Sequence, residues 1–240
     1  MSYNRSVLKP EDYFDLTEFE HRDLFAGVDH VWEVLTRIGP YLAEWFARLG
    51  GPVILGSVES GAWLDGREVY IAPGAVVEPG AYVRAPAVIG PGTVVRHGAY
   101  IRGNVVVGRN CVVGHGTELK NAVLLDGAQA PHFAYVGDSV LGNRVNLGAG
   151  TVLANFKFGG APVTVTWNGR RFETGLRKFG AMVGDDVETG CNAVLSPGTL
   201  VGPRTLIYPN ATVRGVIPPG SVVKFKGQVR VEPRLEQPPR

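Results

Sequence analysis

Residues 71–94 read Ile71-Ala-Pro-Gly-Ala-Val-Val77-Glu-Pro-Gly-Ala-Tyr-Val83-Arg-Ala-Pro-Ala-Val-Ile89-Gly-Pro-Gly-Thr-Val94, with an aliphatic residue at every sixth position. A period of six is neither that of an α-helix nor that of a single half-buried strand. The period runs through ten positions without a miss and returns later in the chain, with Thr189 in one aliphatic place. These positions are Ile71, Val77, Val83, Ile89, Val95, Ile101, Val107, Val113, Leu119 and Leu125, then Val183, Thr189, Leu195, Val201, Ile207 and Val213.

Each six-residue unit combines an aliphatic anchor, a small residue two places before the next anchor, and Gly, Pro or Asn at a corner. We expect the anchor and the small residue to point inward. This pattern is the hexapeptide form of a β-helix, in which three units make a triangular coil of about 18 residues. Successive coils stack at about 4.8 Å. The sequence therefore predicts an all-β fold, a parallel β-helix of hexapeptide repeats.

The composition suits short strands and tight corners. Of 240 residues, 45% are hydrophobic and 19% are charged, and 33 Gly and 17 Pro supply turns. The net charge of +2 is too small to indicate a nucleic acid or an anionic membrane as partner. Two cysteines, Cys111 and Cys191, are too few for a disulfide framework. An acidic N-terminus and the lack of a long apolar run predict a soluble cytoplasmic protein.

Residues 1–52 lack the repeat and are predicted to form an N-terminal helical cap. Asp15 or Thr17 could cap a short helix, and apolar residues between positions 31 and 49 follow helical spacing. We expect Pro40 to divide this stretch into two helices. Three aromatic residues could form a cofactor surface, but packing of the cap against the first coil is the favoured interpretation. They are Trp32, Trp45 and Phe46.

Residues 53–226 are predicted to form the β-helix, and the repeat fails twice within them. The first failure lies between Leu125 and Leu141, because 141 − 125 = 16 is not a multiple of six. Regular coil resumes at Leu141, Leu147 and Leu153. Irregularity in a repeat often marks a functional position.

The second failure covers about residues 157–181. Residues 163–167 alternate like a strand, Asn168-Gly169 is a tight-turn signal, and residues 170–174 can return as the partner strand. We predict a β-hairpin arm that leaves the prism and can reach a neighbour. Residues 227–240 are predicted to be a loose C-terminal tail.

Reading in steps of 18 aligns three cations, each just after an anchor and therefore pointing outward. Arg84, Arg102 and Lys120 would form a ladder on one edge. Like charges at that separation repel, so a phosphate between them would be stabilised. A solvated polar corner is the equally weighted alternative.

Four further polar side chains stand out by position. His97 and His115 are 18 apart; a zinc site is one interpretation, but two histidines do not complete one and a polar corner is favoured. His132 lies inside the first failure, where an imidazole could accept a proton near neutral pH. Cys191 shows no neighbour that would activate it, and we expect a plain buried or corner thiol.

These residues resemble a known family. From about residue 71 to 226, the chain resembles the acetyltransferase half of the bifunctional glucosamine-1-phosphate acetyltransferase/N-acetylglucosamine-1-phosphate uridylyltransferases and the related sugar-phosphate nucleotidylyltransferases. The resemblance implies a left-handed β-helix and a homotrimer with active sites shared between neighbouring prisms. Its motifs are Gly98-Ala-Tyr-Ile-Arg102, Glu118-Leu-Lys120, His132-Phe-Ala-Tyr135-Val-Gly-Asp138, Asn146-Leu-Gly-Ala-Gly-Thr151 and Asn155-Phe156.

Matched position by position, the resemblance implies one catalytic base, four side chains for the sugar phosphate and one near the acetyl group of acetyl-CoA. Cys191, at a position where the family has Ser, and Lys178, as a replacement cation, complete the predicted acetyl-CoA residues, and no metal is predicted. The base is His132, the sugar-phosphate residues are Arg102, Lys120, Tyr135 and Asn146, and the acetyl-CoA residues are Asn155, Cys191 and Lys178.

The chain departs from the family pattern at several positions. The usual Lys six residues after Asn155 is replaced by Ala161, and Lys157, Arg177 or Lys178 could supply the missing cation. The uridylyltransferase domain has no counterpart in these residues, so its activity is not carried over. The other departures are Cys191 for Ser, Ala134 for Thr and Pro131 for Gly.

The preferred hypothesis is acetylation of an amino-sugar 1-phosphate, such as glucosamine 1-phosphate, by acetyl-CoA with His132 as general base. One alternative is a non-catalytic hexapeptide scaffold or a sugar-nucleotide-binding protein. Another is an acyltransferase with a different acceptor. Neither nucleic acid nor a membrane is expected as a partner.

Overall fold

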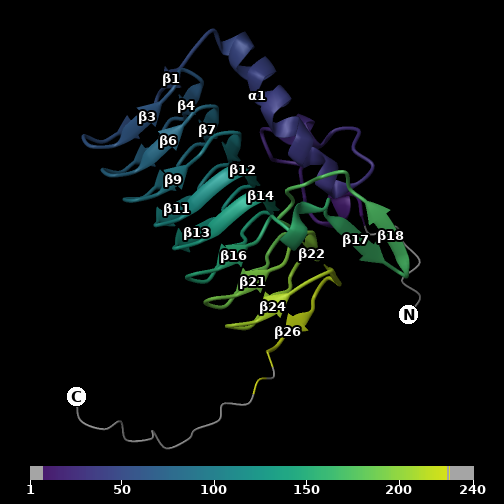
Figure 1. Cartoon of the computed structure of the whole chain (residues 1–240). Coiled ribbons are helices and arrows are strands. Elements are labelled where there is room, and N and C mark those ends of the chain that lie inside the picture. The colour runs from purple at the N-terminus through teal and green to yellow at the C-terminus, as the bar shows by residue number, and fades with distance from the viewer. Residues whose placement is uncertain (1–7, 226, 228–240) are drawn as a thin grey trace, which may run out of the picture.

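The computed structural model describes residues 8–225 and 227. It confirms the predicted left-handed parallel β-helix (Figure 1), a stack of three-sided coils whose strands pair in parallel with the coils above and below. Within each coil the chain passes through three walls in a fixed order, called here walls 1, 2 and 3. The predicted stacking of residues 18 apart is confirmed, since Ile101 pairs with Val83 and with Leu119.

The walls are built from short strands. Wall 1 contains β1 (Val53–Ile54), β4 (Val69–Ile71), β7 (Ala87–Ile89), β10 (Val105–Val107), β19 (Ala181–Val183), β22 (Thr199–Val201) and β25 (Val216–Ile217). Wall 2 contains β2 (Ser57–Val58), β5 (Val76–Val77), β8 (Val94–Val95), β11 (Val112–His115), β13 (Gln129–His132), β15 (Asn146–Leu147), β20 (Glu188–Thr189), β23 (Leu206–Ile207) and β26 (Val222–Val223). Wall 3 contains β3 (Trp63–Asp65), β6 (Tyr82–Arg84), β9 (Tyr100–Ile101), β16 (Val152–Leu153), β21 (Val194–Leu195) and β24 (Thr212–Val213). Two longer strands, β12 (Glu118–Leu124) and β14 (Tyr135–Leu141), run from wall 3 into wall 1.

The interior of the prism is filled as the repeat predicts. Each aliphatic anchor is accompanied by the small residue two positions before it, for example Ala75 with Val77 and Ala99 with Ile101, and all four are at most 1% exposed. Small residues let the chain turn the corner while the anchors fill the axis at close packing.

The first failure of the repeat is a change of coil length. Leu124 pairs with Val107 above and with Leu141 below, so two successive coils contain 17 residues each instead of 18. The sequence interpretation was therefore wrong at Leu125, because Leu124 is the inward anchor and Leu125 packs in a second cluster outside the prism. Losing one residue shifts every following side chain by one position.

The N-terminal segment lies along the outside of wall 1 (Figure 1). It contains η1 (Pro10–Asp12), η2 (Arg22–Phe25), η3 (Val31–Glu33) and α1 (Val34–Leu49). The α1 helix runs along the prism axis: Trp45 packs on Tyr70 of β4 with ring centroids 5.1 Å apart, and the Leu35 carbonyl accepts from Asn121 of β12 at 3.3 Å. Ten helical residues rise about 15 Å, and three coils rise about 14 Å.

Pro40 does not divide the helix, contrary to the sequence expectation. It lies inside α1, which is continuous from Val34 to Leu49. Pro40 leaves the carbonyl of Thr36 without its helical partner, but both residues are on the exposed side of α1, where water can hydrogen-bond that carbonyl.

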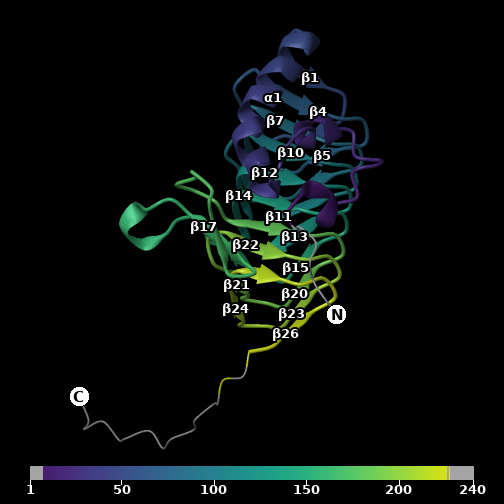
Figure 2. The same ribbon diagram turned by 90° about the vertical axis from the view of Figure 1, so that its right-hand side faces the viewer.

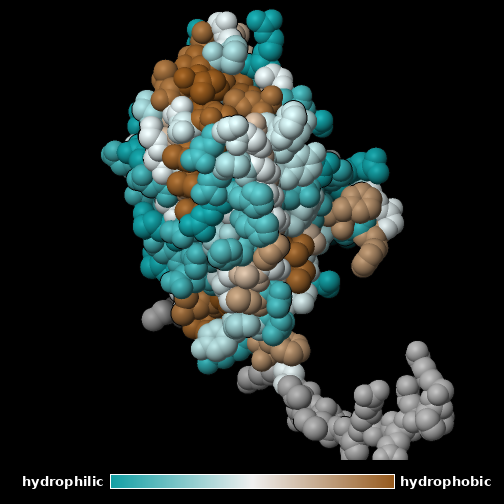
Figure 3. Space-filling model, turned by 90° about the vertical axis from the view of Figure 1, so that its left-hand side faces the viewer, coloured by the Kyte–Doolittle hydropathy of each residue, from teal (hydrophilic) through white to brown (hydrophobic). Residues whose placement is uncertain are grey.

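The expected packing of the helical segment on the start of the repeat is confirmed in part, since Trp45 packs on Tyr70 beside Ile71, but the segment extends much further. The segment covers the outward side chains of wall 1 in six successive coils, while the first coil keeps large apolar side chains exposed. Figure 3 shows apolar residues gathered at that end of the molecule. The wall 1 residues are Val88, Val106, Val123, Val140, Met182 and Leu200, and the exposed first-coil residues are Ile54, Leu55 and Trp63.

The predicted hairpin is present but does not extend freely. β17 (Thr164–Trp167) pairs antiparallel with β18 (Arg170–Glu173) across an Asn168-Gly169 turn, in which both residues have positive φ. Its apolar side packs onto the chain's own N-terminal segment, with Phe172 5.5 Å from His30 between ring centroids. The part that projects is the loop before β17, which contains η4 (Phe158–Gly160) (Figure 2).

No helix among the described residues combines the length and hydropathy needed to cross a membrane. The predicted tail at 227–240 lies outside the described residues except for Gly227.

Candidate active site

The outer face of wall 3 lies between two corners that carry most of the predicted site residues. His132 ends β13 at the corner between walls 2 and 3, and Tyr135 begins β14 just beyond it. Lys120 lies on β12, and Asn155 follows β16 at the corner between walls 3 and 1. The topology therefore brings residues far apart in sequence to one face.

The three cations of the ladder lie in register, and each has a carboxylate partner. Arg84 pairs with Asp65 at 3.0 Å and Arg102 with Glu118 at 2.5 Å. Lys120 pairs with Asp138 at 3.0 Å. The edge is thus a set of ion pairs rather than a row of bare positive charges. The hydrogen bond to Glu118 raises the pKa of Arg102 further above its usual range.

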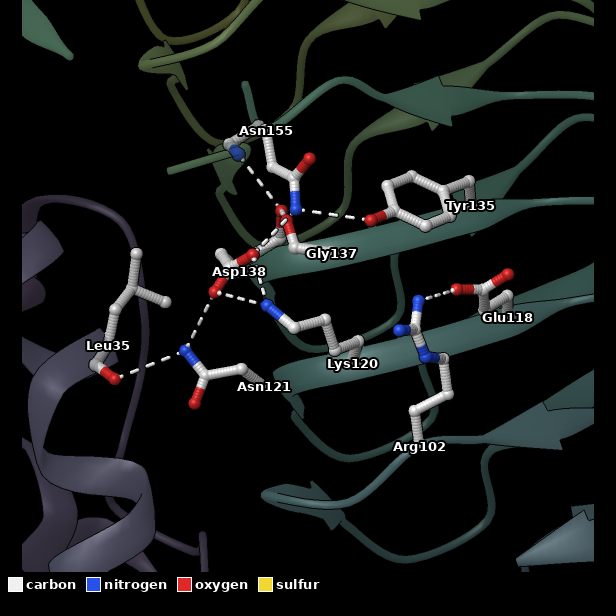
Figure 4. A network of polar contacts seen from close by, with 11 residues as sticks. Leu35, Arg102, Glu118, Lys120, Asn121, Tyr135, Gly137, Asp138 and Asn155 are labelled. Carbon is white, nitrogen blue, oxygen red and sulfur yellow. Dashed lines mark hydrogen bonds and ion pairs between the residues drawn. The ribbon is translucent and has the colours of Figure 1, made fainter. Parts of the chain in front are cut away.

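A buried network joins the second corner to wall 3 (Figure 4). The carboxylate of Asp138 accepts from Lys120 at 3.0 and 3.2 Å, from Asn121 at 3.1 Å and from Asn155 at 2.6 Å. Asn155 also donates to the hydroxyl of Tyr135 at 3.1 Å. Burial raises the pKa of Tyr135, so its phenol keeps the proton and can donate it outward. The network connects three predicted site residues through one carboxylate.

Asp138 ends the motif His132-Phe-Ala-Tyr135-Val-Gly-Asp138, but the sequence alone indicates no role for it. Two spacings could have found it: Asp138 lies 18 residues after Lys120, and it also belongs to a series with a spacing of 17. Four polar residues follow one another at that interval along one corner, and the first three have φ between 47° and 51° at the bend. They are Asn104, Asn121, Asp138 and Asn155.

The corner between walls 2 and 3 carries a column of three histidines, of which steps of 18 reveal only His97 and His115, because His132 lies 17 residues after His115. The rings of His97 and His115 stack with centroids 5.6 Å apart, and His115 pairs in register with His132. Nδ1 of His97 donates to the Pro79 carbonyl at 2.6 Å, and Nδ1 of His115 donates to the His97 carbonyl at 3.0 Å, because a carbonyl can only accept. The polar-corner interpretation fits these two bonds.

His132 breaks this pattern. The carbonyl of His115, its counterpart acceptor, takes the backbone N–H of Phe133 at 2.8 Å. Within residues 8–225 and 227, the exposed imidazole of His132 then has no hydrogen-bond partner. Both of its ring nitrogens remain available to a ligand.

Cys191 and Asn146 lie near this region but not in the network. Cys191 is exposed and lies in the same corner column as His132, two coils further along. Backbone hydrogen bonds relate the positions: the Gly150 N–H donates to the His132 carbonyl, and the Asn192 N–H donates to the Ala149 carbonyl. Asn146 is exposed on wall 2, beside Gln129 and Glu188. Cys111, by contrast, is buried in the prism, where burial raises its pKa to about 12.

Lys178 lies beside Asn155 although the hairpin separates them in sequence. Phe156 and Lys178 form an isolated antiparallel bridge, and the Phe179 N–H donates to the Asn155 carbonyl at 2.9 Å. Ala161 is exposed in the projecting loop. A pocket of about 570 Å³ opens here, and the residues lining it include Asn121, Asp138, Phe156, Arg177 and Lys178.

The part of the chain with described coordinates holds no group of three or more His, Cys, Asp or Glu side chains that could bind a metal ion.

The chain is similar in sequence and in structure to known proteins. The family model described as the GMPPB C-terminal domain matches residues 83–188. The Francisella novicida UDP-N-acetylglucosamine acyltransferase structure is 14% identical with a TM-score of 0.45, covering 69% of this chain and 60% of that one. By its own six-residue repeat and its stack of three-walled coils, the chain is a hexapeptide-repeat β-helix protein.

Two curated relatives are more similar in sequence. A bifunctional sugar-1-phosphate nucleotidylyltransferase/acetyltransferase of Sulfurisphaera tokodaii is 36% identical over 66% of this chain and 39% of its own length. The bifunctional protein GlmU of Methanococcus maripaludis is 38% identical over 84% of this chain and 47% of its own length. The chain thus spans less than half the length of these relatives. The predicted resemblance is confirmed: this protein is related to the bifunctional sugar-1-phosphate nucleotidylyltransferase/acetyltransferases.

Proposed function

We propose that this chain transfers the acetyl group of acetyl-CoA to the amino group of a sugar 1-phosphate, with His132 as general base. The observation that carries the proposal is the free imidazole of His132, the one ring of its column whose counterpart acceptor is occupied by a backbone N–H. The relatives named as acetyltransferases support the same assignment.

The reaction forms one N–C bond and breaks one C–S bond. The amine nitrogen attacks the thioester carbon, and His132 takes a proton from that nitrogen. The tetrahedral intermediate collapses, coenzyme A leaves as a thiolate, and the proton held by His132 can neutralise it. The products are the N-acetylated sugar phosphate and free coenzyme A.

Several neighbours support this arrangement. Tyr135 can donate to an oxygen of the sugar. Arg102 follows β9, which pairs with β12, so Arg102 and Lys120 lie in neighbouring coils and could contact the same phosphate. Lys178, beside Asn155, stands where it can replace the cation absent at Ala161. We also propose that Asn146 and Cys191 face the active site from wall 2 and the His132 corner in a homotrimer, where two prisms meet.

The decisive assay is release of free thiol from acetyl-CoA with a panel of amines that includes glucosamine 1-phosphate and unphosphorylated glucosamine. Turnover that requires the phosphate supports the proposal. Because Arg102 and Lys120 already have carboxylate partners, turnover of other amines is the specific alternative, and it would reassign the acceptor. Calorimetry that detects no acetyl-CoA binding would instead indicate a scaffold.

A further inference from the structure

One carboxylate connects the separate parts of this site. Asp138 lies on β14 with 5% of its surface exposed, and Lys120, Asn121 and Asn155 all donate to it (Figure 4). We propose that Asp138 is a positioning residue, which holds the ammonium group of Lys120 and fixes the direction in which the amide of Asn155 faces the substrates. This inference rests on the acetyl transfer proposed above.

The side chains bonded to the Asp138 carboxylate are all hydrogen-bond donors, so only a hydrogen-bond acceptor fits at this position. An ammonium group has no lone pair to offer, and the side-chain N–H groups of Asn121 and Asn155 also point at the carboxylate. Asparagine has nearly the same shape as aspartate but carries one NH₂ group. An asparagine at position 138 would place its own NH₂ group opposite at least one of these donors, where no hydrogen bond can form. It would also remove the negative charge that pairs with Lys120.

The consequence reaches the substrate face through Asn155. Since Asp138 takes the amide N–H of Asn155 at 2.6 Å, the amide oxygen faces away from the carboxylate, as Figure 4 shows. That oxygen is an acceptor for an N–H group, which both the reacting amine and the amides of acetyl-CoA carry. The same NH₂ group of Asn155 also donates to the hydroxyl oxygen of Tyr135, so the Tyr135 proton is left to donate outward. Asp138 thereby sets one acceptor and one donor on the face that the substrates would meet.

The first experiment is a double-mutant cycle on kcat with the full chain. Asp138→Asn is expected to lower kcat at least about tenfold alone and by a clearly smaller factor in an Asn155→Ala background, because the part of its effect that passes through Asn155 is then already lost and only its hold on Lys120 remains. A purely structural loss would multiply equally in both backgrounds. Equal factors in the two backgrounds, or an unchanged kcat, would overturn the positioning role.

Asp185 provides the matched control. It is a carboxylate with 7% exposure that accepts from the Asn143 side chain at 3.0 Å and from the Asp15 N–H at 2.8 Å, at a different corner of the prism. Asp185→Asn removes a similar buried charge without touching Lys120 or Asn155. We expect it to lower the melting temperature while leaving kcat and KM unchanged. A fall in kcat equal to that of Asp138→Asn would show that any buried carboxylate has this effect, and would overturn the proposal.

A second measurement needs no turnover. Lys120 has 25% of its side chain exposed and Lys178 is exposed, so brief acetic anhydride labelling read by mass spectrometry compares the two amines. Labelling of Lys120 relative to Lys178 should rise at least about threefold in Asp138→Asn and stay level in Asp185→Asn. Level labelling in both variants would show that Asp138 does not hold Lys120.

The outcomes separate the two proposals. If the unmodified chain acetylates no amine of the panel, the proposed function fails and the positioning role fails with it. If the unmodified chain is active and the cycle is multiplicative, only the role of Asp138 fails.

Discussion

The backbone N–H of Phe133 donates to the carbonyl oxygen of His115 at 2.8 Å, in the place where the two preceding coils use a histidine ring instead. Phe133 has φ of 51°, the same left-handed conformation that Gly98 and Gly116 have at the corresponding positions of the two preceding coils, with φ of 73° and 64°. A backbone N–H thus occupies the carbonyl at this corner, so the imidazole of His132 makes no hydrogen bond to it. Two histidines of one column therefore have different tasks.

Replacing each of these histidines by asparagine should separate the tasks. His132→Asn is expected to lower kcat by about 10²- to 10⁴-fold, the usual range for a lost general base, with little change in melting temperature. His115→Asn removes only a corner hydrogen bond and should retain most of the activity. The measurement is steady-state acetyl transfer by both variants. Activity in His132→Asn close to that of the unmodified chain would remove His132 from the mechanism.

Gly137 allows Tyr135 and Asn155 to meet. A Cβ atom at Gly137 would lie 2.6 Å from the Tyr135 hydroxyl and 2.7 Å from the Asn155 side-chain nitrogen. Gly137→Ala should therefore displace the phenol and lower kcat at least about tenfold, since misplaced groups cost rate steeply. A crystal structure of the variant checks the displacement directly. A Tyr135 ring in its original position together with reduced activity would contradict this explanation.

The two thiols should differ sharply in reactivity. Cys111 is buried, its Sγ donates to the Leu125 carbonyl at 3.0 Å, and burial raises its pKa to about 12, whereas Cys191 is exposed. We expect a disulfide reagent to titrate only Cys191 in the native protein and both thiols after denaturation. If Cys191 adjoins acetyl-CoA, saturating acetyl-CoA should also slow its reaction. An unchanged rate would remove Cys191 from the cofactor site.

His21 should make stability depend on pH. It is 2% exposed beside Tyr41, and burial lowers its pKa to about 4 from the usual 6.5. Below pH about 6.5 the unfolded chain binds a proton that the folded chain accepts only near pH 4. The unfolding free energy should therefore fall by about 3 kcal/mol as the pH drops through this window. Urea titrations at pH 7 and pH 5 measure the slope, and His21→Phe should reduce it. An equal slope in the variant would assign the dependence to other groups.

Two glycines of the α1 segment should respond in opposite directions. Gly39 is inside the helix, and an added Cβ would meet Asn104 at an ordinary 3.5 Å, so Gly39→Ala should stabilise the protein by about 0.5–1 kcal/mol. Gly50 ends the helix with φ of 76°, so Gly50→Ala should destabilise it by about 1 kcal/mol. Chemical denaturation compares the two. Destabilisation by Gly39→Ala would show that α1 lies closer to the prism than its contacts indicate.

The sequence predicted the prism well because its interior is periodic. Anchors such as Val77 and Ile101 must face the axis in every coil, so packing alone fixes their spacing. The hairpin was predicted for a similar reason, since the Asn168-Gly169 turn is a local signal. What periodicity did not show was the covering of wall 1, because Val106 and Val123 look like ordinary variable positions until the N-terminal segment packs on them.

The site was predicted in part. His132, Tyr135, Lys120 and Asn155 are candidates that the resemblance predicts, and the structure brings the last three into one network. Asp138 was missed although it lies 18 residues after Lys120, because the series Arg84, Arg102 and Lys120 indicates a set of cations and gives no sign that its next member is an acid that pairs with Lys120. The sequence around Lys178 does not indicate that this residue lies beside Asn155. The two are brought together only when the hairpin between them folds.

The contacts of α1 with Tyr70 and Asn121 have a consequence for how such a chain can evolve. A solenoid can usually gain or lose a repeat, because each repeat touches only its neighbours. Here the α1 helix contacts the stack at two positions, Tyr70 and Asn121, and its fixed length matches the rise of the three coils between them. An inserted coil would lengthen the stack by about 5 Å without lengthening the α1 helix. In this span, the number of coils is therefore set by a segment that contributes no coil of its own.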